Sequence, residues 1–132
     1  MATIFNYTPH TINIVSESVF NPSVRKYEAP ADSIPAASIP SNGMLSAKMA
    51  TEEGNPVNGI PTFVKKVVGC DPLPAEVGQD DIVVVSALYA TAYRQVNGDD
   101  KRIYTVADPV YTPDDGSGKA TIIGCRGICP TI

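Results

Sequence analysis

The sequence predicts an α+β fold: a mostly antiparallel β-sheet or small barrel of six to seven strands, with one short helix at about residues 87–96. Three observations support this prediction. Twelve prolines and ten glycines among 132 residues interrupt the chain too often for long helices. Short apolar or alternating segments, each bounded by turn residues, are typical of strands. One segment combines a helix cap with helical periodicity, and the length suits a single domain over residues 1–132.

The first two strands are predicted within residues 3–15. Ile12 and Ile14 alternate with polar neighbours, as in a strand with one buried face. A polar corner at residues 6–10 separates the two strands, because Pro9 removes a hydrogen-bond donor from the ladder.

Residues 28–43 form a connection rich in Pro, Ala and Ser, in which Ser-Ile-Pro occurs twice. Proline every five residues favours an extended segment. Two interpretations stay open: a long surface loop, or an arm that packs on a second subunit with Ile34 and Ile39 as anchors.

Further strands are predicted at residues 44–50, 60–69, 82–85, 102–111 and 120–129. Asn58-Gly59 is a strong turn signal before the second of these. The β-branched run at residues 82–85 is expected to be buried on both faces. Glycines at positions 124 and 127 indicate a bulge or a close backbone approach in the last strand.

The helix follows the buried strand directly. Ser86 is a good N-cap residue, and Asn97-Gly98 is a good end. Between them, Tyr89, Tyr93 and Val96 recur on one helical face.

The charge pattern argues against two classes of partner. The net charge is −4, and no run of Lys or Arg is longer than two residues. Neither general nucleic-acid binding nor polybasic membrane attachment is therefore expected. No apolar stretch approaches the ~18 residues of a membrane span, and the first residues lack a secretory signal, so we expect a cytoplasmic protein.

The cysteines and the single histidine indicate no metal site. Cys70, Cys125 and Cys129 are odd in number and scattered, which predicts free thiols in a reducing compartment. A Cys125–Cys129 disulfide is the alternative. Because no paired-ligand spacing is present, neither a metal nor a cofactor is predicted.

Three short segments carry the candidate binding chemistry. The N–H groups at a helix start suit a phosphate, so Ser86 is either part of an anion site or an ordinary cap. His10 is either a ligand contact or a solvated turn residue. Arg126, in Gly-Cys-Arg-Gly, either binds a phosphate or base or makes a surface ion pair. The predicted ligand-binding residues are Thr8, His10, Ser86, Tyr89, Tyr93 and Arg126.

The order of several short motifs resembles a family of small proteins from bacteriophage and prophage genomes. The resemblance covers nearly the whole chain, apart from a longer segment at residues 16–39. The motifs are Asn6-Tyr7-Thr8-Pro9-His10, Pro40-Ser41-Asn42-Gly43, Gly59-Ile60-Pro61, Leu73-Pro74, Val85-Ser86 and Gly124-Cys125-Arg126-Gly127. The resemblance implies a phage context, in which small proteins often counter host defence; one such strategy is a sponge that holds a nucleotide signal without cleaving it.

These observations lead to one main hypothesis and two alternatives. The main hypothesis is a phage-type, non-catalytic protein that sequesters a small phosphorylated ligand such as a cyclic nucleotide, as a homo-oligomer. The first alternative is a protein–protein inhibitor or virion accessory protein that uses the acidic second half of the chain. The second is a nucleotide hydrolase that uses His10 and Asp108.

Overall fold

The computed structural model describes residues 2–113 and 120–132, and its one helix and β-rich, barrel-like sheet confirm the α+β class with a small barrel; parallel and antiparallel pairings are equal in number among the described strands. More strands are present than the six or seven predicted, because three-residue strands lie within residues 16–39, where no strand was predicted. The elements are β1 (Ile4–Asn6), β2 (Ile12–Ile14), β3 (Val19–Asn21), β4 (Lys26–Glu28), β5 (Ala37–Ile39), β6 (Ala47–Glu53), β7 (Phe63–Cys70), β8 (Ile82–Val84), α1 (Ala87–Asn97), β9 (Ile103–Tyr111) and β10 (Ile122–Pro130).

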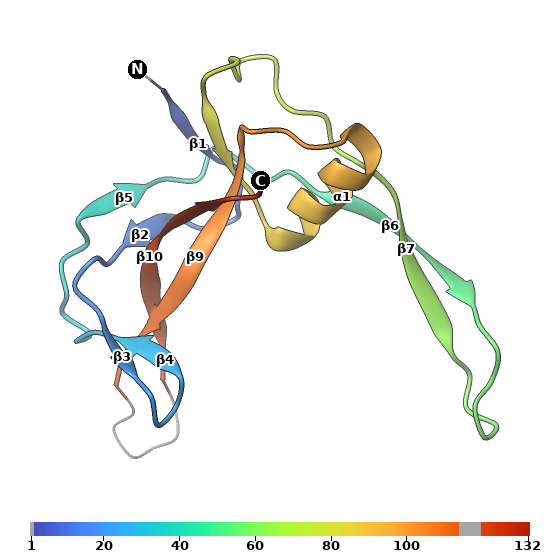
Figure 1. The fold of residues 1–132 in the computed structure, drawn as a ribbon, viewed down its shortest axis with the longest axis horizontal. Coiled ribbons are helices and arrows are strands. Elements are labelled where there is room, and N and C mark those ends of the chain that lie inside the picture. Colours follow the sequence, from blue (N-terminus) through green and yellow to red (C-terminus); the bar gives the residue numbers. More distant parts are fainter. Residues whose placement is uncertain (1, 114–119) are drawn as a thin grey trace.

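Six strands form a nearly closed barrel in the order β1-β8-β9-β10-β2-β5 (Figure 1). The long β9–β10 ladder is antiparallel, and so are the β2–β5 and β3–β4 pairs. Four shorter pairings are parallel, among them β1 with β8 and β8 with β9. The strand pair β3–β4 joins the barrel from outside, through β4 and β9.

Asn6 connects the two ends of the six-strand order. Its side-chain Nδ2 donates to the backbone oxygen of Ile39 in β5 at 2.9 Å and to that of His10 at 2.8 Å. The backbone N–H of Asn6 donates to Asn42 Oδ1 at 2.9 Å, and the Asn42 N–H donates back to the Asn6 oxygen at 2.7 Å. Since Asn6 is fully buried, these bonds replace the strand pairing that a closed barrel would have between β1 and β5.

β8 separates two apolar clusters and is buried on both faces, as its β-branched sequence predicts. Val83 and Val85 pack with Tyr89 of α1 and with Ile103. Val84 faces the other way and packs in the barrel with Ile12 and Cys125. The helix itself is confirmed: it is capped by Ser86 and ends at Gly98, whose N–H donates to the Arg94 oxygen at 2.9 Å. Among the described residues, no helix has the length and apolarity to cross a membrane.

The Pro/Ala/Ser-rich segment lies along its own barrel instead of extending from it. β5 pairs with β2, and Ile39 is partly buried against the cluster around Ile12. Ile39 is therefore not available as an anchor on a second subunit, which corrects that part of the arm interpretation. Ile34, in contrast, is 91% exposed. The element that does project from the body is the β6–β7 hairpin (Figure 1).

Gly124 allows β10 to approach β2. A Cβ atom at this position would lie 2.5 Å from the backbone oxygen of Asn13 and 2.8 Å from a methyl group of Val15. A backbone atom cannot move aside as a flexible side chain can. The strand glycine is therefore required by a close backbone approach, which is one of the two interpretations its sequence position suggested.

Replacing Gly124 should separate β2 from β10. We expect Gly124→Ala to lower the free energy of unfolding by about 1–3 kcal/mol, because the new methyl group overpacks the junction. Gly127→Ala is the matched control on the same strand, since nothing lies within 4 Å of a Cβ there; it should change stability by less than about 1 kcal/mol. Urea denaturation measures both, and equal effects would contradict the steric explanation.

Removing the Asn6 amide should open the barrel. Asn6→Ala leaves the Ile39 and His10 carbonyls and the Thr8 N–H without these partners. We expect a loss of about 3 kcal/mol or more in unfolding free energy, since each buried polar group left unpaired is costly. Asn13→Ala, which removes one exposed hydrogen bond to Ser38, should cost about 1 kcal/mol or less. Similar losses in the two variants would show that Asn6 does not close the barrel.

Candidate functional site

A cleft of about 480 Å³ opens between the N-terminal loop and strands β2, β9 and β10. Its described lining combines apolar strand side chains with a few hydroxyl, amide and imidazole groups. The lining residues are Thr8, His10, Thr11, Ile12, Asn13, Val106, Ile122, Ile123, Gly124 and Cys125. Pockets that bind small molecules commonly have this size and this mixture of groups.

The polar rim of the cleft is held in place by Asn6. Asn6 Oδ1 accepts from the Thr8 N–H at 2.9 Å and from the Thr8 hydroxyl at 2.6 Å, while Asn6 Nδ2 donates to the His10 oxygen. Ser41 Oγ donates to the Thr8 oxygen at 2.6 Å from the other side. The loop backbone is thus fixed at several points, and the exposed His10 imidazole extends from a fixed loop.

The wall of the cleft is apolar and is made where β2 and β10 diverge. These strands share one register pair, Cys125 with Ile14. Ile12 and Cys125 are buried, whereas Val106 and Ile122 remain 41% and 58% exposed. Burial raises the pKa of the Cys125 thiol, so this group stays protonated at neutral pH and behaves as part of the apolar surface.

The structure places two of the six predicted ligand-binding residues in the lining of this cleft, Thr8 and His10. Two residues of the Gly-Cys-Arg-Gly motif, Gly124 and Cys125, join them there. Ser86, Tyr89, Tyr93 and Arg126 are not part of the lining and have partners elsewhere.

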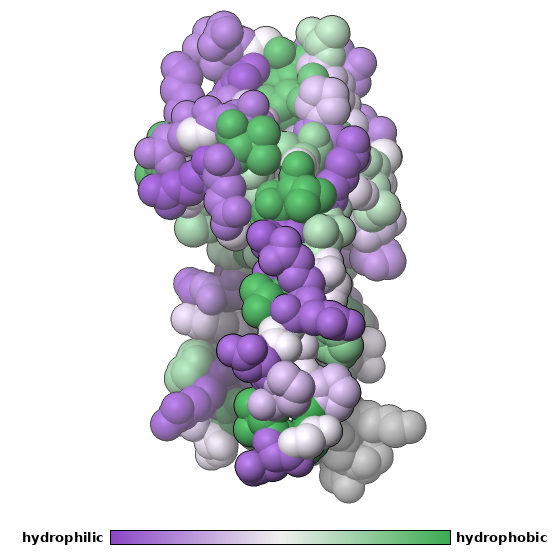
Figure 2. All heavy atoms as spheres, turned by 90° about the vertical axis from the view of Figure 1, so that its right-hand side faces the viewer, coloured by the Kyte–Doolittle hydropathy of each residue, from purple (hydrophilic) through white to green (hydrophobic). Residues whose placement is uncertain are grey.

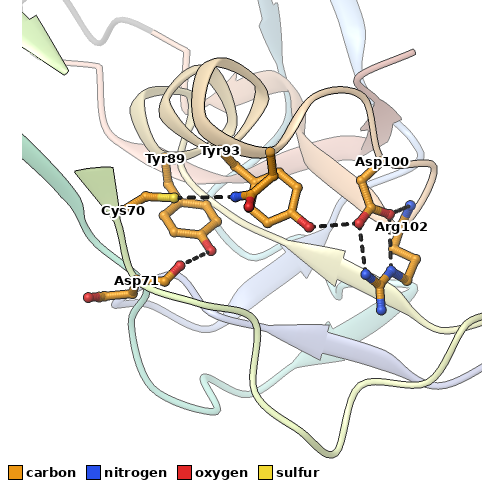
Figure 3. A network of polar contacts seen from close by, with 7 residues as sticks. Cys70, Asp71, Tyr89, Tyr93, Asp100 and Arg102 are labelled. Atoms are coloured by element: carbon orange, nitrogen blue, oxygen red, sulfur yellow. Dashed lines mark hydrogen bonds and ion pairs between the residues drawn. The ribbon is translucent and has the colours of Figure 1, made fainter. Parts of the chain in front are cut away.

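Tyr89 and Tyr93 stabilise the fold, which corrects their assignment to a ligand site (Figure 3). Tyr89 is fully buried, and its hydroxyl donates to the backbone oxygen of Asp71 at 2.6 Å. The Tyr93 hydroxyl donates to Asp100 Oδ2 at 2.9 Å. Burial, as the largest cause, raises the pKa of both hydroxyls above the ordinary value. Of the helical face that the sequence predicted, the two tyrosines are turned toward the protein interior, whereas Val96 is 53% exposed.

Ser86 acts as the helix cap, since its Oγ accepts from the Tyr89 N–H at 3.1 Å. This is the ordinary-cap interpretation of the serine. Arg126 likewise makes the surface ion pair that was one of its two alternatives: its Nη1 lies 3.1 Å from Asp108 Oδ2. Its guanidinium also lies over the Tyr27 ring, 4.2 Å from the centroid. Both side chains are thus engaged outside the cleft.

The sequence did not identify the apolar residues of the cleft. Val106 and Ile122 read as ordinary residues of two strands, and nothing in their local pattern distinguishes a cleft wall from a core. Their exposure depends on how far β2 and β10 diverge, which is a property of the tertiary fold. The glycines of β10 were the available signal, because they indicated an irregular strand at this place.

The described residues contain no group of three or more His, Cys, Asp or Glu side chains that could hold a metal ion. Cys70, Cys125 and Cys129 are free thiols, so the alternative disulfide is not formed. A ligand in the cleft would instead meet hydrogen-bonding groups on one side and apolar side chains on the other.

The Tyr93–Asp100–Arg102 network should make stability depend on acid pH. Arg102 donates to both carboxylate oxygens of Asp100, from Nε at 3.0 Å and from Nη2 at 2.8 Å. This guanidinium holds the pKa of the Asp100 carboxyl well below its usual range. A lowered pKa in the folded state means that the stabilisation is present above about pH 4, the unfolded value, and is lost as the pH falls below it.

We therefore expect Asp100→Asn to cost roughly 1.5–3 kcal/mol near neutral pH, the usual worth of hydrogen bonds to a charged group. The difference between the native protein and the variant should shrink as the pH falls below about 4. Thermal unfolding over a pH series measures it. A difference that does not change with pH would show that the Asp100 charge is not what stabilises the network.

Comparison with known proteins found no matching family model, no matching curated protein and no matching solved structure.

Proposed function

We propose that this protein is a non-catalytic binding protein that sequesters a small nucleotide in the cleft beside the Thr8–His10 loop. The single observation that carries the proposal is the cleft itself, about 480 Å³ in volume, with an apolar wall facing a fixed polar rim. Mouths of small barrels are common ligand sites.

The arrangement of the lining supports a nucleotide as the ligand. Val106 and Ile122, which are 41% and 58% exposed, offer an apolar surface for the flat face of a base. Thr11 and His10, which also line the cleft, carry groups that can bond ribose or phosphate oxygens. The predicted phosphate contacts at Ser86 and Arg126 do not enter this proposal, because their side chains are bound elsewhere.

Two features favour binding over hydrolysis. Asp108, the predicted partner of His10 in a hydrolase, is paired with Arg126 and does not belong to the described lining. The buried Cys125 thiol has a raised pKa and is a poor nucleophile. Together with the resemblance to phage proteins, these features support a role in which a host-defence nucleotide is captured intact in the cytoplasm.

The test is retention of nucleotides by the purified protein. It is incubated with a panel of cyclic oligonucleotides and cyclic ADP-ribose isomers, filtered and heat-denatured, and the released compounds are identified by mass spectrometry. We expect one intact nucleotide. A cleaved product would identify an enzyme, and no retained nucleotide would contradict the proposal.

Ile122→Glu should lower the affinity for the retained nucleotide at least roughly tenfold, because it puts a carboxylate into the cleft wall. Ile132→Glu is the matched control, since Ile122 and Ile132 are 58% and 59% exposed and Ile132 lies outside the cleft. Ser86→Ala and Arg126→Ala should leave the affinity unchanged. Loss of binding in Ser86→Ala alone would move the site to the helix start, and loss in Arg126→Ala alone would move it to the surface beside Asp108 and Tyr27.

A further inference from the structure

The β6–β7 hairpin is a separate two-stranded sheet that extends away from the barrel (Figure 1). Seven residue pairs join its strands, from Ala47 opposite Cys70 to Glu53 opposite Phe63. α1 contacts both strands, and a hydrogen bond from Asn97 to the Cys70 thiol ties the hairpin base to the helix. In the described part of the chain, no other strand pairs with either outer edge.

The hairpin leaves many of its apolar side chains exposed, although two strands on their own are only marginally stable. Figure 2 shows hydrophobic side chains between hydrophilic ones on the side of the molecule from which the hairpin projects. The exposed apolar residues of the hairpin are Met49, Val57, Ile60, Phe63, Val64 and Val68, at 41–65% exposure. A two-stranded hairpin is marginal in water, and three or more strands with an apolar face are normally needed for stability.

The two edges differ in charge. β7 carries the adjacent residues Lys65 and Lys66, and lysines on an edge strand oppose the addition of another strand. β6 carries Lys48 two residues before Ala50 and Glu52 two residues after it, and it ends with a second acidic residue, Glu53. When β6 is laid antiparallel to itself with Ala50 at the centre, Lys48 of each copy faces Glu52 of the other. β6 is thus complementary to itself in charge.

We propose that β6 is a dimerisation edge, which pairs antiparallel with β6 of a second copy of this chain about a two-fold axis at Ala50. The pairing makes one continuous four-stranded sheet from two hairpins, with the same surface used by both copies. Opposite charges directly across an antiparallel pair stabilise it, and the register is the one that produces them.

The contacts already present in one copy fit this register. Glu52 Oε1 lies 2.7 Å from Lys66 Nζ of the neighbouring strand, so in the dimer it would lie between that lysine and Lys48 of the second copy. Met49 lies opposite Val67 within the hairpin and would face Thr51 of the second copy. This dimer uses a different segment from the Pro/Ala/Ser-rich arm, and it does not depend on the proposed nucleotide site.

Cysteine cross-linking tests the register. Residues opposite each other in such a pair have Cβ atoms about 4.5–5.5 Å apart, within reach of a disulfide. In a Cys129→Ser background, which removes the exposed native thiol, Ala50→Cys should give a covalent dimer under mild oxidation. Glu53→Cys is the matched control, because its counterpart in the second copy lies several residues away. Cross-linking of both variants alike, or of neither, would overturn the proposal.

Charge reversal tests the same edge without a covalent bond. Lys48→Glu or Glu52→Lys alone should weaken the dimer roughly tenfold or more in sedimentation equilibrium, because each places like charges opposite one another. The double variant restores opposite charges and should recover most of the dimer. A native protein that is monomeric at all accessible concentrations would overturn the proposal, and so would a dimer that none of these variants affects.

Discussion

The buried amide of Asn6 is the interaction on which the other parts of this structure depend. Six strands are joined by ordinary ladders, but the first and last of them are joined through one side chain that bonds the Ile39 oxygen. A buried amide is tolerated only when its donors and acceptors are satisfied, and here both ends of the amide are. The same atoms fix the position of the loop that follows β1, so barrel closure and the shape of the cleft rim have one common cause.

This dual role explains the motif Asn-x-Thr-Pro-His in physical terms. Its asparagine is structural, its threonine completes the hydrogen bonding of that asparagine, and its histidine lines the cleft. The opposite side of the cleft depends on Gly124, which permits the close approach of β10 to β2 beside the Cys125–Ile14 pair. Two short motifs at the two ends of the chain thus build the two sides of the same cleft.

Local signals in the sequence predicted local structure well. The Ser86 cap, the Gly98 end and the doubly buried run before the helix were all readable, because each depends on neighbours in sequence. Short strands such as β5 could not be predicted from the sequence. A three-residue strand in a proline-rich segment forms only because β2 is there to pair with it. The Tyr89–Tyr93 face was read correctly as one face, but whether such a face meets a ligand or the interior is decided by the elements that pack on it. For the same reason, Thr8 and His10 could be selected from the sequence, while the apolar wall opposite them could not.

The pairing of β1 with β8 has a consequence for how the chain folds during synthesis. Ile4 lies beside Ile82, so the first strand has no ladder partner until β8 has been made. β2 can pair early with β5, whereas its other neighbour, β10, is made much later. Such distant pairings are slow to form, because closing a long loop costs conformational entropy before any contact is gained. The β3–β4 hairpin and the β2–β5 pair, whose strands are near in sequence, can therefore form on the nascent chain before β1 meets β8, and so can the β6–β7 hairpin.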